Sequence, residues 1–404
     1  MDKDIDIIML PSPLWDAPYS STSFSLAKEL AETNRVFYLD NPFTLKHILK
    51  DFNKPLIKKR IPALIFGKSP YRNIPGASKN FIAVTPGIVI PVNFLNAGML
   101  YNFISKYNDK VIYHSIKKLL KDYDLKKYIF INSFNPFYAL DIRKNFNPLL
   151  NIYQTVDDLR TGKRLSKHGV RLEKIAVENA DFTLTTSKEL YRLKLEQSKN
   201  VYYLPNAADI SLFSKTIHEK FEKPQDIAHI ITKIIGYVGN IYKRIDYSLL
   251  KKIATAHPDK TLLMVGPSTH NEYLDYDVHT LPNVIFTGPK PMEMLPAYLQ
   301  HIDCAIIPFL CSTLTKSIYP LKINEYLAAG KSVVTTDFSE DIRDFSEVIQ
   351  LAKNEEDFIQ KINIALQQTD LIDIKKRSDI AQTNTWNARA IRLKEIISDN
   401  LKNK

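Results

Sequence analysis

The chain has 404 residues, 45% of them hydrophobic and 11% aromatic, which is enough to bury the cores of two domains and excludes a disordered chain. Its formal net charge is +11, but acids and aromatics interrupt the basic runs, so nucleic-acid binding is not predicted. The basic charge fits either a solvated face or a surface attracted to anionic lipid, and both interpretations stay open.

The N-terminal half alternates short apolar runs with amphipathic stretches, which is typical of parallel strands separated by helices. Strands are predicted at residues 6–10, 35–40, 128–133, 150–155, 181–187 and 201–205, and helices at 20–33 and 170–180. The N-terminus carries acids where a secretory signal would carry bases. Residues 80–105 lack charge, but repeated Pro, Gly and Asn predict a strand, an apolar loop and the start of a helix instead of a membrane span.

Two acids directly follow the predicted strand at residues 150–155. Asp157 and Asp158 should therefore lie at the carboxyl end of that strand. Carboxylates there can bind hydroxyl groups of a ligand, or one of them can act as a general base. Alternatively, one of the two caps the following loop or pairs with a nearby basic residue.

The composition changes after residue 205, where a polar stretch without firm periodicity leads into a second α/β series. Its strands are predicted at residues 233–240, 261–267, 283–289, 303–309, 331–337 and 347–352. We therefore predict two Rossmann-like, doubly wound α/β domains that face each other across a cleft. The N-terminal domain spans 1–205, the connection 206–232, the C-terminal domain 233–385, and a final amphipathic helix 386–404.

Three strands of the second series end in turn residues. These are Gly239 with Asn240, then Gly266, then Thr287 with Gly288. Ligands of open α/β sheets gather beyond the carboxyl ends of the strands, and glycine lets the backbone approach them closely. These turns predict a ligand-binding edge.

A short motif, Pro320-Leu321-Lys322-Ile323-Asn324-Glu325, adds a helix start to this edge. Proline suits the first turn of a helix, and the free N–H groups that follow, with the helix dipole, favour an anion such as phosphate. Lys322 adds a positive charge. Glu325, about one turn deeper, is a good acceptor for two adjacent hydroxyls, such as those of a ribose. The motif predicts a site for a nucleotide diphosphate.

These motifs resemble the donor domain of GT-B glycosyltransferases. The likeness is greatest to the retaining group 1 (family 4-like) enzymes, and to a subgroup associated with bacterial surface polysaccharide synthesis. The stretch NEYLAAGKSVVTTD matches the second half of that group's signature, and GYVGNIYKRIDYSLL resembles its glycine turn followed by bases that contact the diphosphate. The resemblance covers residues 230–385 well and the N-terminal half loosely, and it implies that the final helix crosses back to the N-terminal domain.

The resemblance assigns expected roles to individual residues. The expected catalytic residues are Asp157, Lys243 and Lys322; the expected donor-binding residues are Gly239, Asn240, Arg244, Gly266, Thr287, Gly288, Pro320, Leu321 and Glu325; the expected acceptor-binding residues are Trp15, Ser20, Ser21 and Asp158. Two positions depart from the group's pattern. Ser317 stands where the first acid of the Glu pair is expected, and Asp157 stands near the group's N-domain histidine. The sugar-specific part of the site is therefore expected to diverge.

The resemblance implies a glycosyltransferase that moves a sugar from a nucleotide-diphosphate donor to a glycan or lipid-linked acceptor, with retention of configuration. Lys243, Arg244, Lys322 and the helix start would stabilise the leaving diphosphate, so no metal and no further cofactor is expected. The nine histidines show no zinc-like spacing, and two cysteines favour a reducing cytoplasm.

We also expect peripheral association with the inner face of the cytoplasmic membrane, through basic residues and shallow insertion of the apolar loop at residues 86–91. Two alternatives remain open. One is a nucleotide-sugar 2-epimerase on the same fold, and the other is a non-catalytic relative that acts as a membrane-associated partner.

Overall fold

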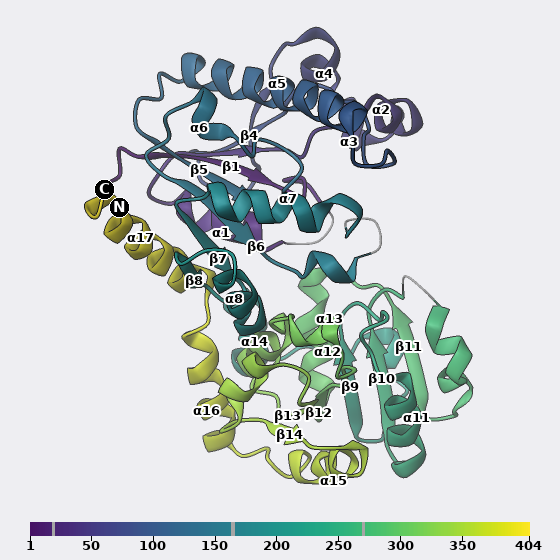
Figure 1. Ribbon diagram of the computed structural model, residues 1–404. Helices are drawn as coiled ribbons and strands as arrows, with labels where there is room; N and C mark the ends of the chain where they lie inside the picture. The colour runs from purple at the N-terminus through teal and green to yellow at the C-terminus, as the bar shows by residue number, and fades with distance from the viewer. Residues whose placement is uncertain (18–20, 163–165, 269–270) are drawn as a thin grey trace. The chain divides into compact units, whose positions relative to one another are not determined.

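The computed structural model describes residues 1–17, 21–162, 166–268 and 271–404, which divide into two compact units (Figure 1). Unit 1 comprises Met1–Pro205 and Arg389–Lys404, and unit 2 comprises Asn206–Ala388. The second segment of unit 1 begins within the last helix, α17 (Trp386–Lys402). The predicted domain boundary at residue 205 and the end of the first segment of unit 1 therefore coincide.

Unit 1 is built on an eight-stranded sheet in the order β3-β4-β2-β1-β5-β6-β7-β8. Its strands are β1 (Asp6–Pro11), β2 (Val36–Leu39), β3 (Tyr71–Asn73), β4 (Phe81–Val84), β5 (Tyr128–Ser133), β6 (Asn151–Thr155), β7 (Phe182–Thr185) and β8 (Val201–Tyr203). Only the edge strand β3 runs antiparallel to its neighbour. Most of these strands are buried along their whole length, because helices cover both faces of the sheet.

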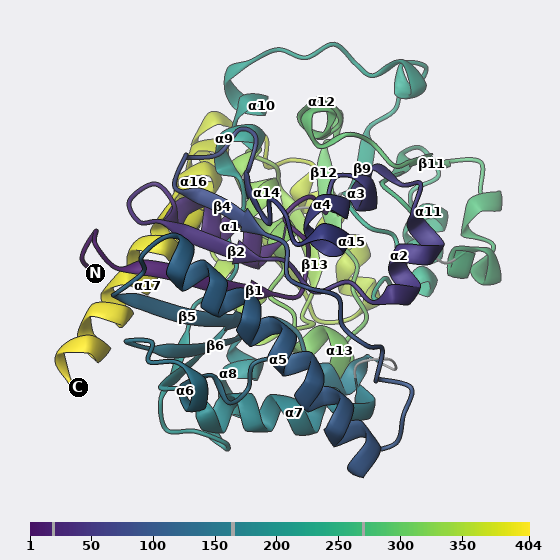
Figure 2. The same cartoon turned by 90° about the horizontal axis from the view of Figure 1, so that it is seen from above.

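The helices of unit 1 flank this sheet (Figures 1 and 2). They are α1 (Thr22–Leu30), α2 (Leu45–Asp51), α3 (Pro55–Lys58), α4 (Ile61–Phe66), α5 (Met99–Asp122), α6 (Ile142–Asn145), α7 (Ser166–Asn179), α8 (Lys188–Leu195) and most of α17, with the 3-10 turn η1 (Leu159–Thr161). In the view of Figure 2, α2 to α5 lie on the same side of the sheet. Ile112, Ile116 and Leu119 of α5 pack into the core on that side. α17 buries Ala390, Leu393 and its two consecutive isoleucines.

The uncharged segment 80–105 forms β4, a loop and the start of α5, as predicted. Among the described residues, no helix is long and apolar enough to cross a membrane. The loop at residues 86–91, predicted to insert shallowly into a membrane, is partly held against the protein. Pro86 and Val89 are buried, the N–H of Val89 donates to the carbonyl of Phe43 over 2.9 Å, and the side-chain amide of Asn108 brackets Ile90 with two bonds of 2.8 Å. Pro86 and Val89 therefore pack against the protein, whereas Ile90 stays exposed, and insertion of this loop into a membrane stays a prediction.

Unit 2 carries a six-stranded parallel sheet in the order β11-β10-β9-β12-β13-β14. Its strands are β9 (Ile234–Val238), β10 (Thr261–Val265), β11 (Val284–Gly288), β12 (Cys304–Ile307), β13 (Val333–Thr336) and β14 (Gln350–Ala352). Its helices are α9 (Ile210–Phe213), α10 (Lys215–His218), α11 (Tyr247–Ala256), α12 (Leu295–His301), α13 (Thr313–Lys316), α14 (Leu321–Ala328), α15 (Glu355–Ala365) and α16 (Leu371–Gln382). Renumbered within the unit, the strand order is 3-2-1-4-5-6, the doubly wound order of dinucleotide-binding sheets.

The predicted connection 206–232 is folded onto unit 2. It forms α9, α10 and the short turn η2 (Gln225–Ile227). Ile210, Phe213, Ile227 and Ile230 belong to the hydrophobic core of the unit. These anchors are spaced irregularly among polar residues, so no helical or strand period revealed them in the sequence.

Candidate functional site

The carboxyl ends of β9, β10 and β11 lie side by side and bring the three predicted turns together. The N–H of Gly239 donates to the carbonyl of Val265 over 2.7 Å, and the N–H of Gly266 donates to that of Gly288 over 3.0 Å. The hydroxyl of Thr287 donates to the same Gly288 carbonyl over 3.2 Å. These bonds join the three turns into one continuous backbone edge.

Close approach requires glycine at two of these turns. Gly239 has φ +151° and Gly266 has φ +140°, backbone conformations that side chains rarely adopt. A Cβ at Gly239 would lie 1.9 Å from Cε of Lys322, and a Cβ at Gly266 would lie 2.0 Å from the carbonyl oxygen of Gly239. Gly239 therefore leaves the space that the lysine side chain occupies, and Gly266 leaves space for the backbone of Gly239.

β9 and β12 separate at this edge of the sheet. The two strands pair only at Ile235 with Cys304 and at Gly236 with Ala305. Beyond these pairs the hydroxyl of Tyr326 takes the place of a neighbouring strand, because it accepts from the N–H of Val238 over 2.8 Å and donates to its carbonyl over 3.1 Å. This is where the strand order reverses, and ligands of doubly wound sheets bind outside such a point.

α14 starts next to this reversal point. Pro320 is its N-cap residue, one position earlier than the first turn expected from the sequence, and no side chain caps the helix. The N–H of Ile323 donates to the carbonyl of Pro320 over 3.2 Å. The amides of Leu321 and Lys322 thus begin the helix without a capping side chain, as in helix N-termini that hold anions.

Lys322 is enclosed by this edge. Its side chain is 17% exposed, and its Nζ lies 3.7 Å from a carboxylate oxygen of Glu325, which is also 17% exposed. The Nζ lies 5.6 Å from the centre of the Tyr237 ring. Burial lowers the pKa of Lys322, Glu325 opposes that shift, and the nearby positive charge of Arg244 adds to it. Two cations are therefore held close together beside a single carboxylate.

Two polar atoms at the same strand end have no hydrogen-bond partner among the described residues. One is the buried Nε of Arg244, whose guanidinium lies 5.3 Å from the centre of the Phe309 ring, and the other is the buried Oδ1 of Asn240. Buried polar groups are nearly always hydrogen-bonded, so these two atoms are available to hydrogen-bond a ligand at this edge. Lys243 does not join them: its side chain is exposed, with Nζ 5.4 Å from the Tyr242 ring centre. Its catalytic role stays a prediction.

Ser317 occupies the position expected for the first acid of the Glu pair. It is buried at the end of α13, and its hydroxyl donates to the carbonyl of Leu314 over 2.9 Å. A serine held in this way supplies no carboxylate to a sugar. Among the described residues, no group of three or more His, Cys, Asp and Glu side chains could hold a metal ion.

The two acids after β6 differ in environment. Asp157 is exposed. Asp158 is buried, and its carboxylate caps η1 by accepting from the N–H of Arg160 and binds the guanidinium of the same residue over 2.7–3.0 Å. Arg160 lowers the pKa of Asp158 against the opposing effect of burial. This is the capping alternative that the sequence left open, and the acceptor role of Asp158 stays a prediction.

The remaining acceptor candidates lie near the end of β1. The hydroxyl of Ser21 caps α1 by accepting from the N–H of Phe24 over 3.2 Å, and Ser20 lies outside the described residues. The ring of half-buried Trp15 has Nζ of Lys59 at 4.7 Å from its centre. The first turn is thus held by helix capping and by a cation–π contact.

A buried ionic cluster beneath this turn was not predicted. Arg60 is 2% exposed and binds Asp40 over 2.8–3.0 Å and Asp16 over 2.6–3.0 Å. Burial raises the pKa of Asp40 to about 6, although Arg60 opposes the shift. The only sequence signal was Asp40 at the end of an apolar strand, because the partners lie 20 and 44 positions from Arg60 along the chain.

Comparison with known proteins agrees with this geometry. Residues 232–368 match the family model of the group 1 glycosyl transferases. Over 159 residues the chain is 35% identical to TuaH of Bacillus subtilis, described as a teichuronic acid biosynthesis glycosyltransferase. That match covers 38% of this chain and 40% of the relative, so the chain spans less than half of the relative's length in the alignment.

Solved structures match over nearly the whole chain. Sucrose-phosphate synthase from Thermosynechococcus elongatus has a TM-score of 0.66 at 14% identity, covering 99% of this chain and 100% of its own. A UDP-forming α,α-trehalose-phosphate synthase from Burkholderia vietnamiensis has 0.66 at 11% identity, covering 98% and 96%. Anabaena HepE, in complex with UDP and glucose, has 0.61 at 13% identity, covering 98% and 99%. The two parallel-sheet units have the GT-B fold.

Proposed function

We propose that this chain, whose residues 232–368 form a group 1 glycosyltransferase domain, transfers a sugar from a nucleotide diphosphate to a glycan or lipid-linked acceptor in surface polysaccharide synthesis. One observation carries the proposal. Lys322 and Arg244 are held together beside the start of α14, at the point where the sheet order of unit 2 reverses. Such a cationic, glycine-walled edge suits a diphosphate.

The chemistry needs charge stabilisation on the leaving group. As the sugar departs from the diphosphate, negative charge grows on the phosphate oxygens, and Lys322, Arg244 and the first amides of α14 would stabilise it. The carboxylate of Glu325 would accept hydrogen bonds from the ribose hydroxyls. Groups already positioned for this work need no reorganisation during the reaction. We therefore propose that transfer requires no metal.

The acceptor half of the proposal rests on relatives and on unit 1. The Bacillus relative is described as acting in teichuronic acid biosynthesis, which supports a surface polysaccharide as the product. The UDP and glucose bound to HepE support a uridine donor. Asp157, exposed at the end of β6, is the candidate for contact with sugar hydroxyls or with positive charge at the anomeric carbon.

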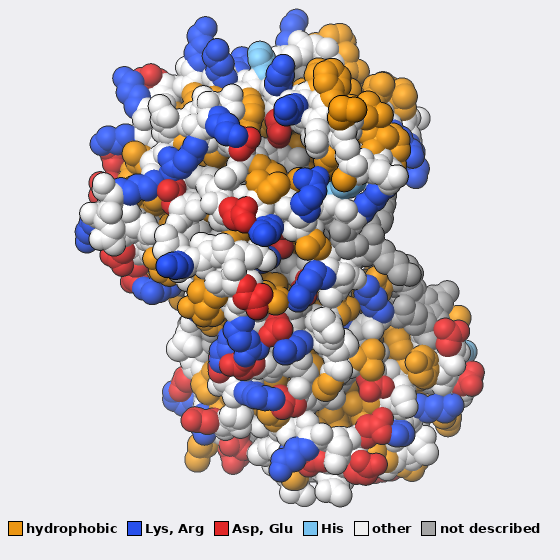
Figure 3. Space-filling view, in the orientation of Figure 1, with side chains coloured by type: hydrophobic (Ala, Val, Ile, Leu, Met, Phe, Trp, Pro, Cys, Tyr) orange, Lys and Arg blue, Asp and Glu red, His pale blue; other side chains and the backbone are white. Residues whose placement is uncertain are grey.

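We further propose that unit 1 associates with the inner face of the cytoplasmic membrane. Its helix α2 presents Leu45, Leu49 and Phe52 to solvent with Lys46 and Lys50 between them, and Leu49 is 72% exposed. Figure 3 shows hydrophobic side chains gathered where Figure 1 places α2 to α4. Monomeric proteins rarely expose large apolar patches, and adjacent lysines favour anionic lipid.

The first experiment is calorimetry of the purified chain with UDP, GDP and ADP, followed by transfer assays with the matching nucleotide sugars. We expect one nucleotide diphosphate to bind at least about tenfold more tightly than the others, and sugar release to depend on acceptor. Conversion of the nucleotide sugar to its 2-epimer without acceptor would support the epimerase alternative. Nucleotide binding without any turnover would support the non-catalytic relative.

Membrane association is tested separately by co-sedimentation with vesicles that contain phosphatidylglycerol. We expect Leu49→Glu to weaken sedimentation several-fold, because it places an acid in the apolar face of α2. The matched control is Leu371→Glu, at the start of α16 in unit 2, where the leucine is 82% exposed. Equal effects of the two changes, or no sedimentation of the wild-type chain at low salt, would refute the assignment.

A further inference from the structure

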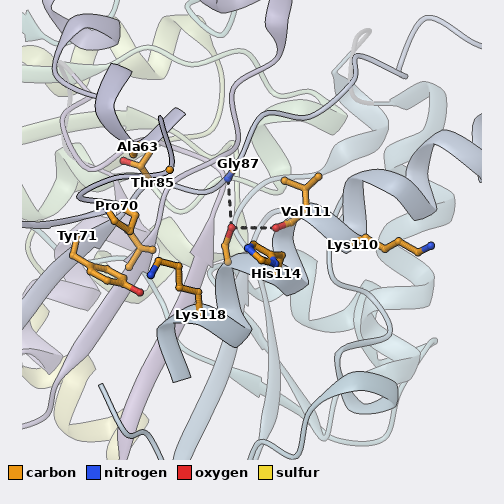
Figure 4. Close-up of a pocket in the computed structure, with 12 residues that line it drawn as sticks. Ala63, Pro70, Tyr71, Thr85, Gly87, Lys110, Val111, His114 and Lys118 are labelled. Atoms are coloured by element: carbon orange, nitrogen blue, oxygen red, sulfur yellow. Dashed lines mark hydrogen bonds between the residues drawn. The ribbon is translucent and has the colours of Figure 1, made fainter. Parts of the chain in front are cut away.

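Unit 1 contains a cavity that none of the candidate site residues lines. It has a volume of about 320 Å³ and lies between the end of α4, the β3–β4 pair and the middle of α5 (Figure 4). β4 is two positions from β1 in the sheet, so the strand that borders the cavity is not one of the β1–β5 pair, where that sheet reverses its order. A volume near 300 Å³ is at the small end of ligand sites in proteins.

The walls of the cavity are mainly apolar. Ala63, Pro70, Val84 and Val111 contribute hydrocarbon surface. The one hydroxyl on the α5 side is already engaged, because Ser115 donates to the carbonyl of Val111 over 3.1 Å and accepts from the backbone of the loop after β4. A sugar that entered this space would lose its hydrogen bonds to water and would find few groups to replace them. A hydrocarbon chain makes no hydrogen bonds to water, so it would lose none on entering.

The rim of the cavity is basic. Lys110, His114 and Lys118 follow one another at four-residue intervals along α5, so they share one side of the helix. Lys118 pairs with Asp122 over 2.8 Å, and Asp122 also accepts from the hydroxyl of Tyr71. Within the described parts of the chain, neither Lys110 nor His114 forms an ion pair or hydrogen bond, and Figure 4 shows the Lys110 side chain extending outward. These two groups are free to meet an anion.

Apolar surface continues from the cavity along both helices that border it. On α4, Ile65 and Phe66 are exposed, directly after Ala63 of the cavity wall. On α5, Phe103 and Tyr107 are exposed, two turns and one turn before Val111 respectively. A ligand with an apolar chain could therefore leave the cavity without entering water.

We propose that this cavity binds a lipid phosphate, with the hydrocarbon chain against the apolar walls and the phosphate at Lys110 and His114. The inference deepens the acceptor half of the proposed function and rests on it, because a lipid-linked acceptor joins a glycan to a chain through a phosphate group. The chain would remain on the exposed apolar surface of α4 and α5, and the attached glycan would extend from the rim.

The test is calorimetric titration of the full chain with decyl phosphate below its micelle concentration, compared with inorganic phosphate and with neutral decyl maltoside. We expect decyl phosphate to bind at least about tenfold more tightly than either. Val111→Trp fills the cavity and should abolish this binding, and Ala63→Phe fills it from the opposite wall should the first variant fail to fold. Lys110→Glu should weaken binding about fivefold or more, since it reverses a charge beside the phosphate.

The matched control is Lys79→Glu, the same charge change on an exposed lysine at the opposite end of β4. It should leave decyl phosphate binding unchanged. If inorganic phosphate binds as tightly as decyl phosphate, the cavity is a general anion site. If decyl maltoside binds as tightly as decyl phosphate, the cavity is a nonspecific apolar surface. Either result overturns the proposal. Nucleotide binding without decyl phosphate binding would overturn this inference alone. Binding of decyl phosphate without binding of any nucleotide would support the lipid phosphate site and refute the proposed function.

Discussion

Replacing Lys322 with methionine should separate the stability of unit 2 from its ability to bind a nucleotide. Methionine keeps an unbranched side chain, one heavy atom shorter than that of lysine, and removes its charge. At 3.7 Å and an effective dielectric constant near 20, the attraction between Lys322 and Glu325 is roughly 4–5 kcal/mol. Burying the ammonium costs several kcal/mol, and the lowered pKa of Lys322 shows that burial outweighs the carboxylate. The free energy of unfolding should therefore change by less than about 1 kcal/mol.

Affinity for the nucleotide diphosphate should instead fall sharply. A hydrogen bond to a charged group contributes about 1.5–3 kcal/mol, which corresponds to roughly 10- to 150-fold in the dissociation constant. Calorimetry measures this value, and chemical denaturation measures the stability of the same sample. Lys251→Met, on an exposed lysine of α11, is the matched control and should change neither quantity.

The pH dependence gives a second check on the same residue. Because the pKa of Lys322 is lowered in the folded protein, the ammonium loses its proton at lower pH than an ordinary lysine as pH rises. Wild-type affinity for the diphosphate should decline over that alkaline range, and that decline should be absent in Lys322→Met. A loss of more than about 3 kcal/mol in stability, with affinity unchanged, would make Lys322 a structural ion-pair partner and refute the reasoning.

Three further outcomes are expected. Glu325→Ala should weaken nucleotide binding by about 30- to 1,000-fold, because it removes two charge-assisted hydrogen bonds, and circular dichroism should show an intact fold. If the variant binds the nucleotide as tightly as the wild type, Glu325 does not bind the ribose. Transfer activity should persist in excess EDTA, and complete loss reversed by Mn²⁺ or Mg²⁺ would contradict metal-free catalysis. Asp157→Asn should lower turnover at least about tenfold with nucleotide affinity nearly unchanged, whereas Asp158→Asn should act less on turnover; equal, small effects on turnover would make both residues structural.

The sequence predicted the strands and the edge formed by the glycine turns and the start of α14 because their signals are local. A buried parallel strand is a continuous apolar run, and the edge is marked by glycine turns and by a lysine and a glutamate three residues apart. Local pattern also anticipated that an acid after β6 could cap the next turn, as Asp158 does.

Features that depend on distant partners were not predictable. The cluster of Arg60 with Asp16 and Asp40 joins three positions with no common period. The cavity of unit 1 is formed where α4, β4 and α5 meet, and nothing in their separate patterns reveals the space between them. The loop at residues 86–91 is a related case, because Pro86 and Val89 are buried by long-range contacts that composition does not show, whereas Ile90 stays exposed.

The division of unit 1 into two chain segments has a consequence for how the protein is made. The segment Arg389–Lys404 supplies buried apolar residues of α17, and Asn400 donates to the hydroxyl of Tyr202 over 3.0 Å. During translation, residues 1–205 emerge first but receive this helix only after the whole of unit 2 has been synthesised. Unit 2 is one continuous segment and can complete its core on the ribosome, while unit 1 must wait with an uncovered apolar surface. Limited proteolysis of nascent chains should therefore show that unit 2 becomes resistant to cleavage before unit 1, although unit 2 is synthesised later.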